Sequence, residues 1–279
     1  MRNATVYRPL VGLATLEKRH VVQTYRLNCA TIMELVAQLE PDLLPAIRHP
    51  NAIPPPVQVL SVLHHLTSGS FHVTVGLAAG MSQPMFSNDL RVALCALLKH
   101  LASYIRSPQC ADLSSVKAAF CRVAHVPHVI GATDATHIAL VPPRRSKQVY
   151  RNCKNFHSVN EQVVCLADQY ISQVTPRFPG SVHDSFILRN STIPHMMAPL
   201  MKDRAWLIGM YPCICGLLSS LHSCPPGLDI PLTSVHTADS CYPNLPWVRT
   251  PVRHPTTDAE DCYNEAHGRT RWVIERSFG

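Results

Sequence analysis

The chain has 279 residues, of which 46% are hydrophobic and 15% are charged, and its formal net charge is +7 at pH 7. This composition excludes a disordered polymer and predicts one large globular domain or two smaller ones, while the positive charge suits a polyanionic partner. There is no apolar run of about 18 residues, no signal-peptide pattern and no regular cysteine framework, so we expect a reduced intracellular protein without a membrane partner.

The first part of the chain predicts helices. Residues 1–24 show little periodicity, and we expect them to form a loose lead-in. Residues 25–126 predict an all-helical region, because apolar residues recur at helical spacing over 28–39 and again over 57–66. The proline-rich stretch 49–56 between these two helices predicts a linker.

A helix-turn-helix-like outline lies within this helical region. A short helix over 74–79, a turn at Gly80 and a second helix that opens near Ser82 compose it. One interpretation is a recognition helix that presents polar side chains, such as Gln83 and Asn88, to DNA. The other is a helical bundle that only scaffolds the rest of the chain, and the small number of basic residues in the segment keeps both interpretations open.

Residues 127–279 predict strands followed by a long helix, and hence an α/β fold. The β-branched, apolar segment 128–141 is bounded by prolines and predicts a strand with Asp134 inside it. Further strands are expected over 162–167, 171–177 and 205–209, and a long helix over 257–278. Pro179-Gly180 ends the third strand, and Ser181 can cap a short helix that begins near Asp184.

Three acidic residues stand in conspicuous surroundings: Asp134 in GATDATH, Asp184 in PGSVHDS and Glu275 in VIERSFG. A carboxylate held near a core costs free energy unless a positive group meets it, and a divalent cation is a common such group. Carboxylates from distant parts of a chain can share two Mg²⁺ or Mn²⁺ ions that drive phosphodiester chemistry. Each acid also has a structural interpretation: a strand end, a helix terminus, and an ion pair with a neighbouring arginine.

The segments GATDATH, FPGSVHDSFIL, ADSCYPNLPWVRTP and RTRWVIERSFG resemble, in this order, the DDE endonuclease domain of PIF/Harbinger transposases. The resemblance extends from about Tyr25 to Gly279. It implies an RNase H-like mixed sheet flanked by helices, and divalent-metal-dependent cleavage of DNA. It also implies a nuclear protein with a cytoplasmic pool, which works with a Myb/SANT-like companion.

The resemblance also implies roles for single residues. Asp134, Asp184 and Glu275 correspond to the catalytic metal ligands of the family, and Asp239 corresponds to a further acid that contacts metal. His183, beside Asp184, is expected to orient that ligand without touching the metal itself.

A run of basic residues lies between the first two expected strands, and its members are Arg144, Arg145, Lys147, Arg151 and Lys154. The functional interpretation is a loop that grips DNA phosphates. A solvated loop and a localisation signal are the alternatives.

The chain also departs from the family pattern. Residues 210–238 separate the fourth strand from Asp239, and their removal would restore a family-like WLIGDSCYP, so we expect a looped-out insertion or an unspliced piece of a gene model. Leu166 and Cys153 replace residues that are often acidic and basic in the family, and the family continues beyond Gly279, so we expect a missing C-terminal part. Two hypotheses follow: an active endonuclease, or a non-catalytic protein that binds DNA or a partner.

Overall fold

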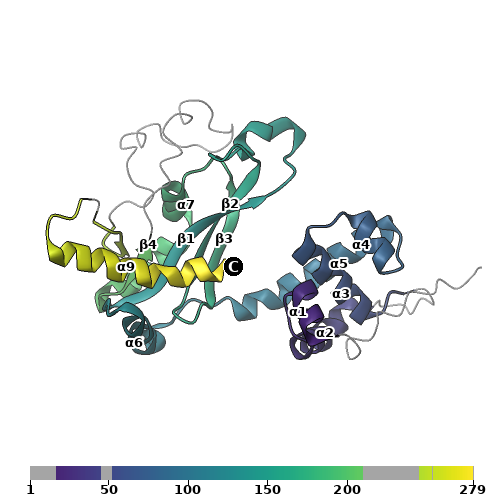
Figure 1. The fold of residues 1–279 in the computed structure, drawn as a ribbon, viewed down its shortest axis with the longest axis horizontal. Helices are drawn as coiled ribbons and strands as arrows, with labels where there is room; N and C mark the ends of the chain where they lie inside the picture. Colours follow the sequence, from purple (N-terminus) through teal and green to yellow (C-terminus); the bar gives the residue numbers. More distant parts are fainter. Residues whose placement is uncertain (1–16, 45–51, 210–244, 253, 279) are drawn as a thin grey trace, which may run out of the picture. The chain divides into compact units, whose positions relative to one another are not determined.

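The structure, a computed structural model, describes residues 17–44, 52–209, 245–252 and 254–278. Its contacts divide the chain into two compact units, Met1–Tyr104 and Ile105–Gly279, which we name the helical unit and the sheet unit (Figure 1). This division differs from the boundary expected at 126/127. The reason is that helix α6 (Leu113–Ala124) packs against strand β1 (Val129–Ala139) of the sheet unit.

The helical unit consists, in its described part, of α1 (Lys18–Tyr25), α2 (Cys29–Leu43), α3 (Pro55–Ser68), α4 (His72–Ala78) and α5 (Gln83–Tyr104). Asn28 caps α2, because its side-chain oxygen accepts a hydrogen bond from the Thr31 N–H at 2.9 Å. Gly69 ends α3 in the left-handed conformation, with φ of 62°. A common core of buried apolar residues holds the helices together, and its members include Ile32, Leu39, Val59, Leu60 and Phe86.

Two expectations for this unit have clear outcomes. The loose lead-in over 1–24 is wrong for residues 18–24, because α1 buries Val21 completely against the other helices. A helix of two turns is too short to show periodicity in a sequence. The helix-turn-helix-like outline is confirmed: α4 and α5 flank Gly80, whose φ of 73° suits glycine. The expected linker 49–56 lies partly outside the described residues.

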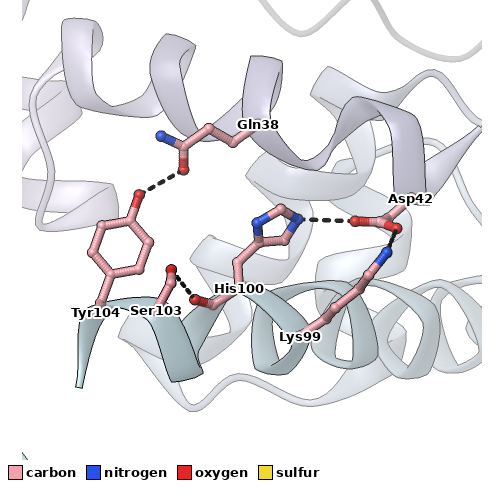
Figure 2. Close-up of polar contacts among 6 residues, drawn as sticks. All are labelled: Gln38, Asp42, Lys99, His100, Ser103 and Tyr104. Carbon is pink, nitrogen blue, oxygen red and sulfur yellow. Dashed lines mark hydrogen bonds and ion pairs between the residues drawn. The ribbon is translucent and has the colours of Figure 1, made fainter. Parts of the chain in front are cut away.

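Polar contacts join the end of α5 to α2 (Figure 2). The carboxylate of Asp42 accepts hydrogen bonds from Lys99 and from His100 Nε2, the latter at 2.9 Å. One turn further along, the Tyr104 hydroxyl donates to Gln38 Oε1 at 3.0 Å. The Lys99 side chain is 68% exposed, so this ion pair lies at the surface and adds little to stability.

The sheet unit contains, among its described residues, a five-stranded mixed sheet in the order β3-β2-β1-β4-β5. Strand β2 is antiparallel to both of its neighbours, β1 and β3. Strand β4 is parallel to both of its neighbours, β1 and β5. The remaining strands are β2 (Ser158–Cys165), β3 (Ile171–Pro179), β4 (Trp206–Gly209) and β5 (Val248–Arg249). The four expected strands are confirmed, while β5 was not foreseen.

Helices cover both faces of this sheet. Val163 and Val164, neighbours on β2, belong to different core clusters, because alternate side chains of a strand point to opposite faces. One cluster includes residues of α7 (Asp184–Asn190) and α8 (Ile193–Leu200), and the other includes residues of α6 and of α9 (Asp258–Ser277). The mixed α/β architecture expected from the sequence, with an RNase H-like sheet flanked by helices, is therefore confirmed.

The helix α9 is the longest helix of the sheet unit's described part, and its start is well defined. Thr257 and Glu260 form a reciprocal capping box in which each side chain accepts a hydrogen bond from the other residue's N–H. Val273 and Ile274, fully buried, fasten the last turns of α9 to the sheet. No helix among the described residues has both the length and the apolar character needed to cross a membrane.

Candidate active site

Asp134 lies inside β1, next to the point where β4 ends. It pairs with Val163 of β2, and the preceding residue, Thr133, pairs with Gly209, the last residue of β4. The side chain is 16% exposed. Burial raises the pKa of the Asp134 carboxyl, and the charge of Asp184 adds to this effect, whereas the Arg271 guanidinium opposes it.

An arginine of α9 connects two of the three expected acids. Arg271 Nη2 donates to Asp134 Oδ2 at 3.0 Å, and its Nη1 lies 2.8 Å from Glu275 Oε1. Arg271 and Glu275 are one helical turn apart and therefore share a face of α9. A residue of the sheet and a residue of the helix thus meet at one guanidinium.

Asp184 is the first residue of α7, and the sheet holds it in place. Asn160 of β2 is buried, and its side-chain NH₂ donates to Asp184 Oδ1 at 2.8 Å and to the Val182 carbonyl at 2.9 Å. The expectation that Ser181 caps this helix is wrong: the N-cap residue is His183, and the Ser181 N–H instead donates to the Val149 carbonyl at 3.2 Å.

Gly180, just before this segment, stands where no side chain fits. A Cβ atom there would lie 2.3 Å from Ser158 Oγ and 2.7 Å from both the Ser158 and the Tyr150 carbonyl oxygens. The Gly180 N–H donates to the Ser158 carbonyl at 2.8 Å. The glycine of PGSVHDS is therefore required by a close approach of backbone segments, and this approach positions the chain that leads to Asp184.

A hydrogen-bonded network lies beside Asp184. Asn152 Nδ2 donates to Ser158 Oγ at 2.9 Å, and the same oxygen lies 3.1 Å from His137 Nδ1. Burial lowers the pKa of His137, the charge of Lys154 lowers it further, and the charge of Asp184 opposes both. His137 is thus hydrogen-bonded within this network.

The basic run, residues 144–154, is largely exposed, and we name it the basic shelf. Residues Arg144–Tyr150 make two short 3-10 turns that meet at a kink, where Ser146 has a non-helical φ of −130° and ψ of 30°. The five basic side chains are exposed, and none of them forms an ion pair with another described residue. Asn152 fastens the end of the segment, because its Oδ1 accepts from the N–H groups of Lys154 and Phe156 at 3.0 and 3.2 Å. Binding of DNA by these residues stays a prediction.

The expected site residues are brought together in part. Asp134 and Glu275 meet at Arg271, while Asp184 reaches Asp134 only through the electrostatic effect of its charge. In the described ranges, no group of three or more His, Cys, Asp or Glu side chains is arranged to hold a metal ion. Asp239 and the expected insertion 210–238 lie outside the described residues. The convergence of all three acids stays a prediction.

His183 and two further residues need separate mention. The His183 side chain is exposed, and its expected role beside the metal stays a prediction. Sequence reasoning did not identify Asn160, which carries no local signal and becomes important only when β2 and α7 meet. Arg271 was recognised only as a local partner for Glu275, four residues away, and its contact with Asp134 was not foreseen.

The candidate site lies within a segment of the chain that matches known proteins. Residues 133–279, which include Asp134, Asp184 and Glu275, match a family model described as DDE superfamily endonuclease. The chain is 31% identical over 250 residues to "Putative nuclease HARBI1" of Bos taurus, covering 88% of this chain and 63% of that protein. The protein of the same name in Homo sapiens is 31% identical over 248 residues, with coverage of 88% and 63%.

The protein of that name in Xenopus laevis is 27% identical over 259 residues, or 92% of this chain and 66% of that protein. The chain spans about 63% of the length of the mammalian relatives. No solved structure matches it. The resemblance expected from the motifs is confirmed, and because the family model covers more than half of the chain, the chain belongs to the family of DDE superfamily endonucleases.

Proposed function

We propose that this protein is a divalent-metal-dependent DNA endonuclease that hydrolyses phosphodiester bonds. The observation that carries the proposal is the meeting of Asp134 from β1 and Glu275 from α9 at one cationic group. This meeting lies within the residues that match the endonuclease family. The name of these relatives, "Putative nuclease HARBI1", supports the same activity.

The donor set suits Mg²⁺ or Mn²⁺. Carboxylate oxygens are hard ligands of the kind these ions prefer. Burial and the charge of Asp184 both raise the pKa of Asp134, which means that ionised Asp134 requires a positive partner. We assign Asp134, Asp184 and Glu275 as the ligands, with Asp239 as a fourth. When bound, two such cations supply activation of a water nucleophile and stabilisation of the leaving oxygen.

The protein's own residues have distinct tasks in this proposal. Asn160 fixes one oxygen of Asp184, so this carboxylate is oriented before DNA arrives. Asp134, at 16% exposure, is shielded from most of the solvent, and this strengthens its electrostatic interactions. The basic shelf holds the DNA backbone, and its members are Arg144, Arg145, Lys147, Arg151 and Lys154.

We further propose a nuclear location with a cytoplasmic pool, DNA as the substrate, and a Myb/SANT-like companion protein. These proposals rest on the family relationship and on the formal charge of +7. Co-purification of the tagged full chain with a Myb/SANT-like protein would support the last one, whereas DNA binding unaffected by such a protein would contradict it.

A supercoiled-plasmid nicking assay tests the proposed activity. The protein is expected to nick DNA with Mn²⁺ or Mg²⁺ and to be inactive in EDTA. Asp134→Asn and Glu275→Gln should each abolish nicking, whereas Glu265→Gln should not, because Glu265 lies on the same helix but pairs only with exposed Arg269 among the described residues. Nicking that survives in Asp134→Asn would mean that another site or a contaminant cuts the DNA.

A non-catalytic DNA-binding protein is the second candidate. The observation that favours it is that Arg271 already pairs with both Asp134 and Glu275, and that no three His, Cys, Asp or Glu side chains of the described residues are grouped to hold a metal ion. Both candidates predict binding through the basic shelf. Replacement of Arg144, Arg145 and Lys147 by Ala should reduce the salt dependence of DNA affinity by up to about three units of slope. Absence of nicking with every divalent cation, together with salt-dependent binding, would favour this second candidate.

A further inference from the structure

We propose that Arg271 is a resident counter-cation of the carboxylate site, which holds Asp134 and Glu275 together in the metal-free protein and releases them when a divalent cation binds. This inference rests on the proposed function, because it assigns the two acids as metal ligands. Arg271 would then be a positioning residue: it acts on the acids and not on the substrate.

The geometry of the guanidinium carries the first step. Its two terminal nitrogens bind different acids, with Nη2 to Asp134 at 3.0 Å and Nη1 to Glu275 at 2.8 Å. The arginine therefore connects β1 with α9, across 137 residues of sequence. Without a positive group between them, two carboxylates in this place would repel each other.

The second observation is the burial of the ion pair between Arg271 and Asp134. The side chains of Arg271 and Asp134 are both 16% exposed, whereas Arg269 and Glu265, an ion pair two residues away on the same helix, are 66% and 64% exposed. A buried pair is costly to break when one partner is removed, while an exposed pair contributes little. Helix α9 thus carries an exposed ion pair, Arg269 with Glu265, and also Arg271, which makes a largely buried pair with Asp134 of β1 and a second pair with Glu275, whose side chain is 42% exposed.

The incomplete bonding of Arg271 carries the third step. Its Nε atom is buried and has no hydrogen-bond partner among the described residues. An arginine with a purely structural role normally satisfies its buried donors, because an unmade hydrogen bond costs free energy. The guanidinium of Arg271 is therefore held in place mainly by its contacts with the two acids. A ligand that binds these carboxylates removes the main interactions that keep the guanidinium in this position.

The guanidinium of Arg271 and a bound divalent cation exclude each other, because both are positively charged. A guanidinium and a divalent cation that compete for the same two carboxylates repel each other strongly at contact distance in a partly buried site. The carboxylates and the nearby charge of Asp184 favour the doubly charged ion. Removal of the arginine should therefore loosen the metal-free site and, at the same time, tighten metal binding.

The test compares Mn²⁺ binding and thermal stability of the full chain in wild type, Arg271→Gln and Arg269→Gln. Calorimetric titration with Mn²⁺ at constant salt gives Kd, and melting in EDTA and in saturating Mn²⁺ gives the stability of each state. Arg271→Gln should have a lower melting temperature than wild type in EDTA and should bind Mn²⁺ at least about fivefold more tightly. Its melting temperature should also rise more on addition of Mn²⁺ than that of wild type, because bound ligand stabilises the folded state. Arg269→Gln should behave like wild type.

Arg271→Lys keeps a charge but loses the fork that reaches both acids, so its Kd should lie between those of wild type and Arg271→Gln. It also serves the comparison if Arg271→Gln fails to fold. An unchanged or weakened Mn²⁺ affinity in the variants, with equal loss of stability in both conditions, would overturn the inference. Absence of Mn²⁺ binding in wild type would instead defeat the metal site itself, and the two failures are thereby distinguished.

Discussion

The helical unit and the sheet unit each bury an aspartate, and they treat its charge differently. Asp89 of α5 is 3% exposed, and its Oδ1 atom has no hydrogen-bond partner among the described residues. Ser61 offers one long hydrogen bond of 3.5 Å to Oδ2. Burial raises the pKa of Asp89 to about 6. Asp134 has a guanidinium at 3.0 Å and a backbone N–H at 2.9 Å.

This difference separates an acid without a cation from an acid that we propose to be functional. Asp89 meets no cation among the described residues, so its charged form is disfavoured and its role is confined to the packing of the helices. Asp134, on the central strand of the sheet, receives a cation from a distant part of the chain, and this cation opposes the rise that burial causes in the pKa of Asp134. Burial alone therefore does not distinguish the proposed site from the helical core, whereas burial together with a counter-charge from a distant part of the chain does.

The largest effect on stability should come from Asp89→Asn, which removes a charge that has no positive partner among the described residues. The folded-state pKa, about 6, lies above the ordinary value of 3.8, so wild type loses stability as pH rises from about 4 to above 6. At pH 7 the variant should be more stable by up to about 3 kcal/mol, at 1.36 kcal/mol per unit of pKa. Urea unfolding at pH 4 and pH 7 measures this gap, which should be small at pH 4.

A destabilising result for Asp89→Asn at pH 7 would contradict the comparison, since it would mean that the charge is stabilised by a group that the structure does not place beside it. The same substitution at Asp134 should act in the opposite direction in EDTA, because Arg271 would lose the more deeply buried of its two acidic partners.

A smaller effect is expected from glycine substitutions in the sheet unit. Gly180→Ala would force a Cβ atom to within 2.3 Å of Ser158 Oγ, and should cost about 1–3 kcal/mol, as overpacking does. Gly268→Ala on α9 is the matched control: nothing lies within 4 Å of its Cβ position, and alanine should stabilise the helix by about 1 kcal/mol. Equal effects of the two substitutions in thermal unfolding would show that the close approach at Gly180 does not exist in solution.

The smallest effect should come from Asp42→Asn in the helical unit. Hydrogen bonds from Lys99 and then from His100 lower the pKa of Asp42, so this contribution is present above the ordinary carboxyl pKa and is lost as pH falls through the lowered value. The group is at the surface, and the melting temperature at pH 7 should fall by a few degrees at most. A fall as large as the shift from Asp89→Asn would show that the contacts of Figure 2 are essential to the unit.

The sequence predicts well those parts of the fold that have a local signal. The strand around Asp134 is β-branched and bounded by prolines, and α9 has a helical pattern, so both were predicted nearly to their ends. Strand β5 has two residues and exists by pairing with β4, so no local pattern could predict it.

For the candidate site, the sequence selected the acids, whose role stays a prediction, but not the residues that contact them. Motifs identified Asp134, Asp184 and Glu275, because these residues stand in segments with family-like surroundings. The contacts of Asn160 with Asp184 and of Arg271 with Asp134 join residues 24 and 137 positions apart. Such pairs depend on the sheet register and on the packing of α9, which a single sequence does not specify.

The most direct test of the account is a crystal structure of the protein grown with Mn²⁺, with X-ray data collected at the manganese absorption edge. We predict anomalous peaks roughly 2.0–2.6 Å from carboxylate oxygens of Asp134, Asp184 and Glu275. The guanidinium of Arg271 should be displaced from Asp134. Absence of manganese at these acids, with Arg271 still bound to both Asp134 and Glu275, would contradict the proposed metal site and the nuclease activity built on it.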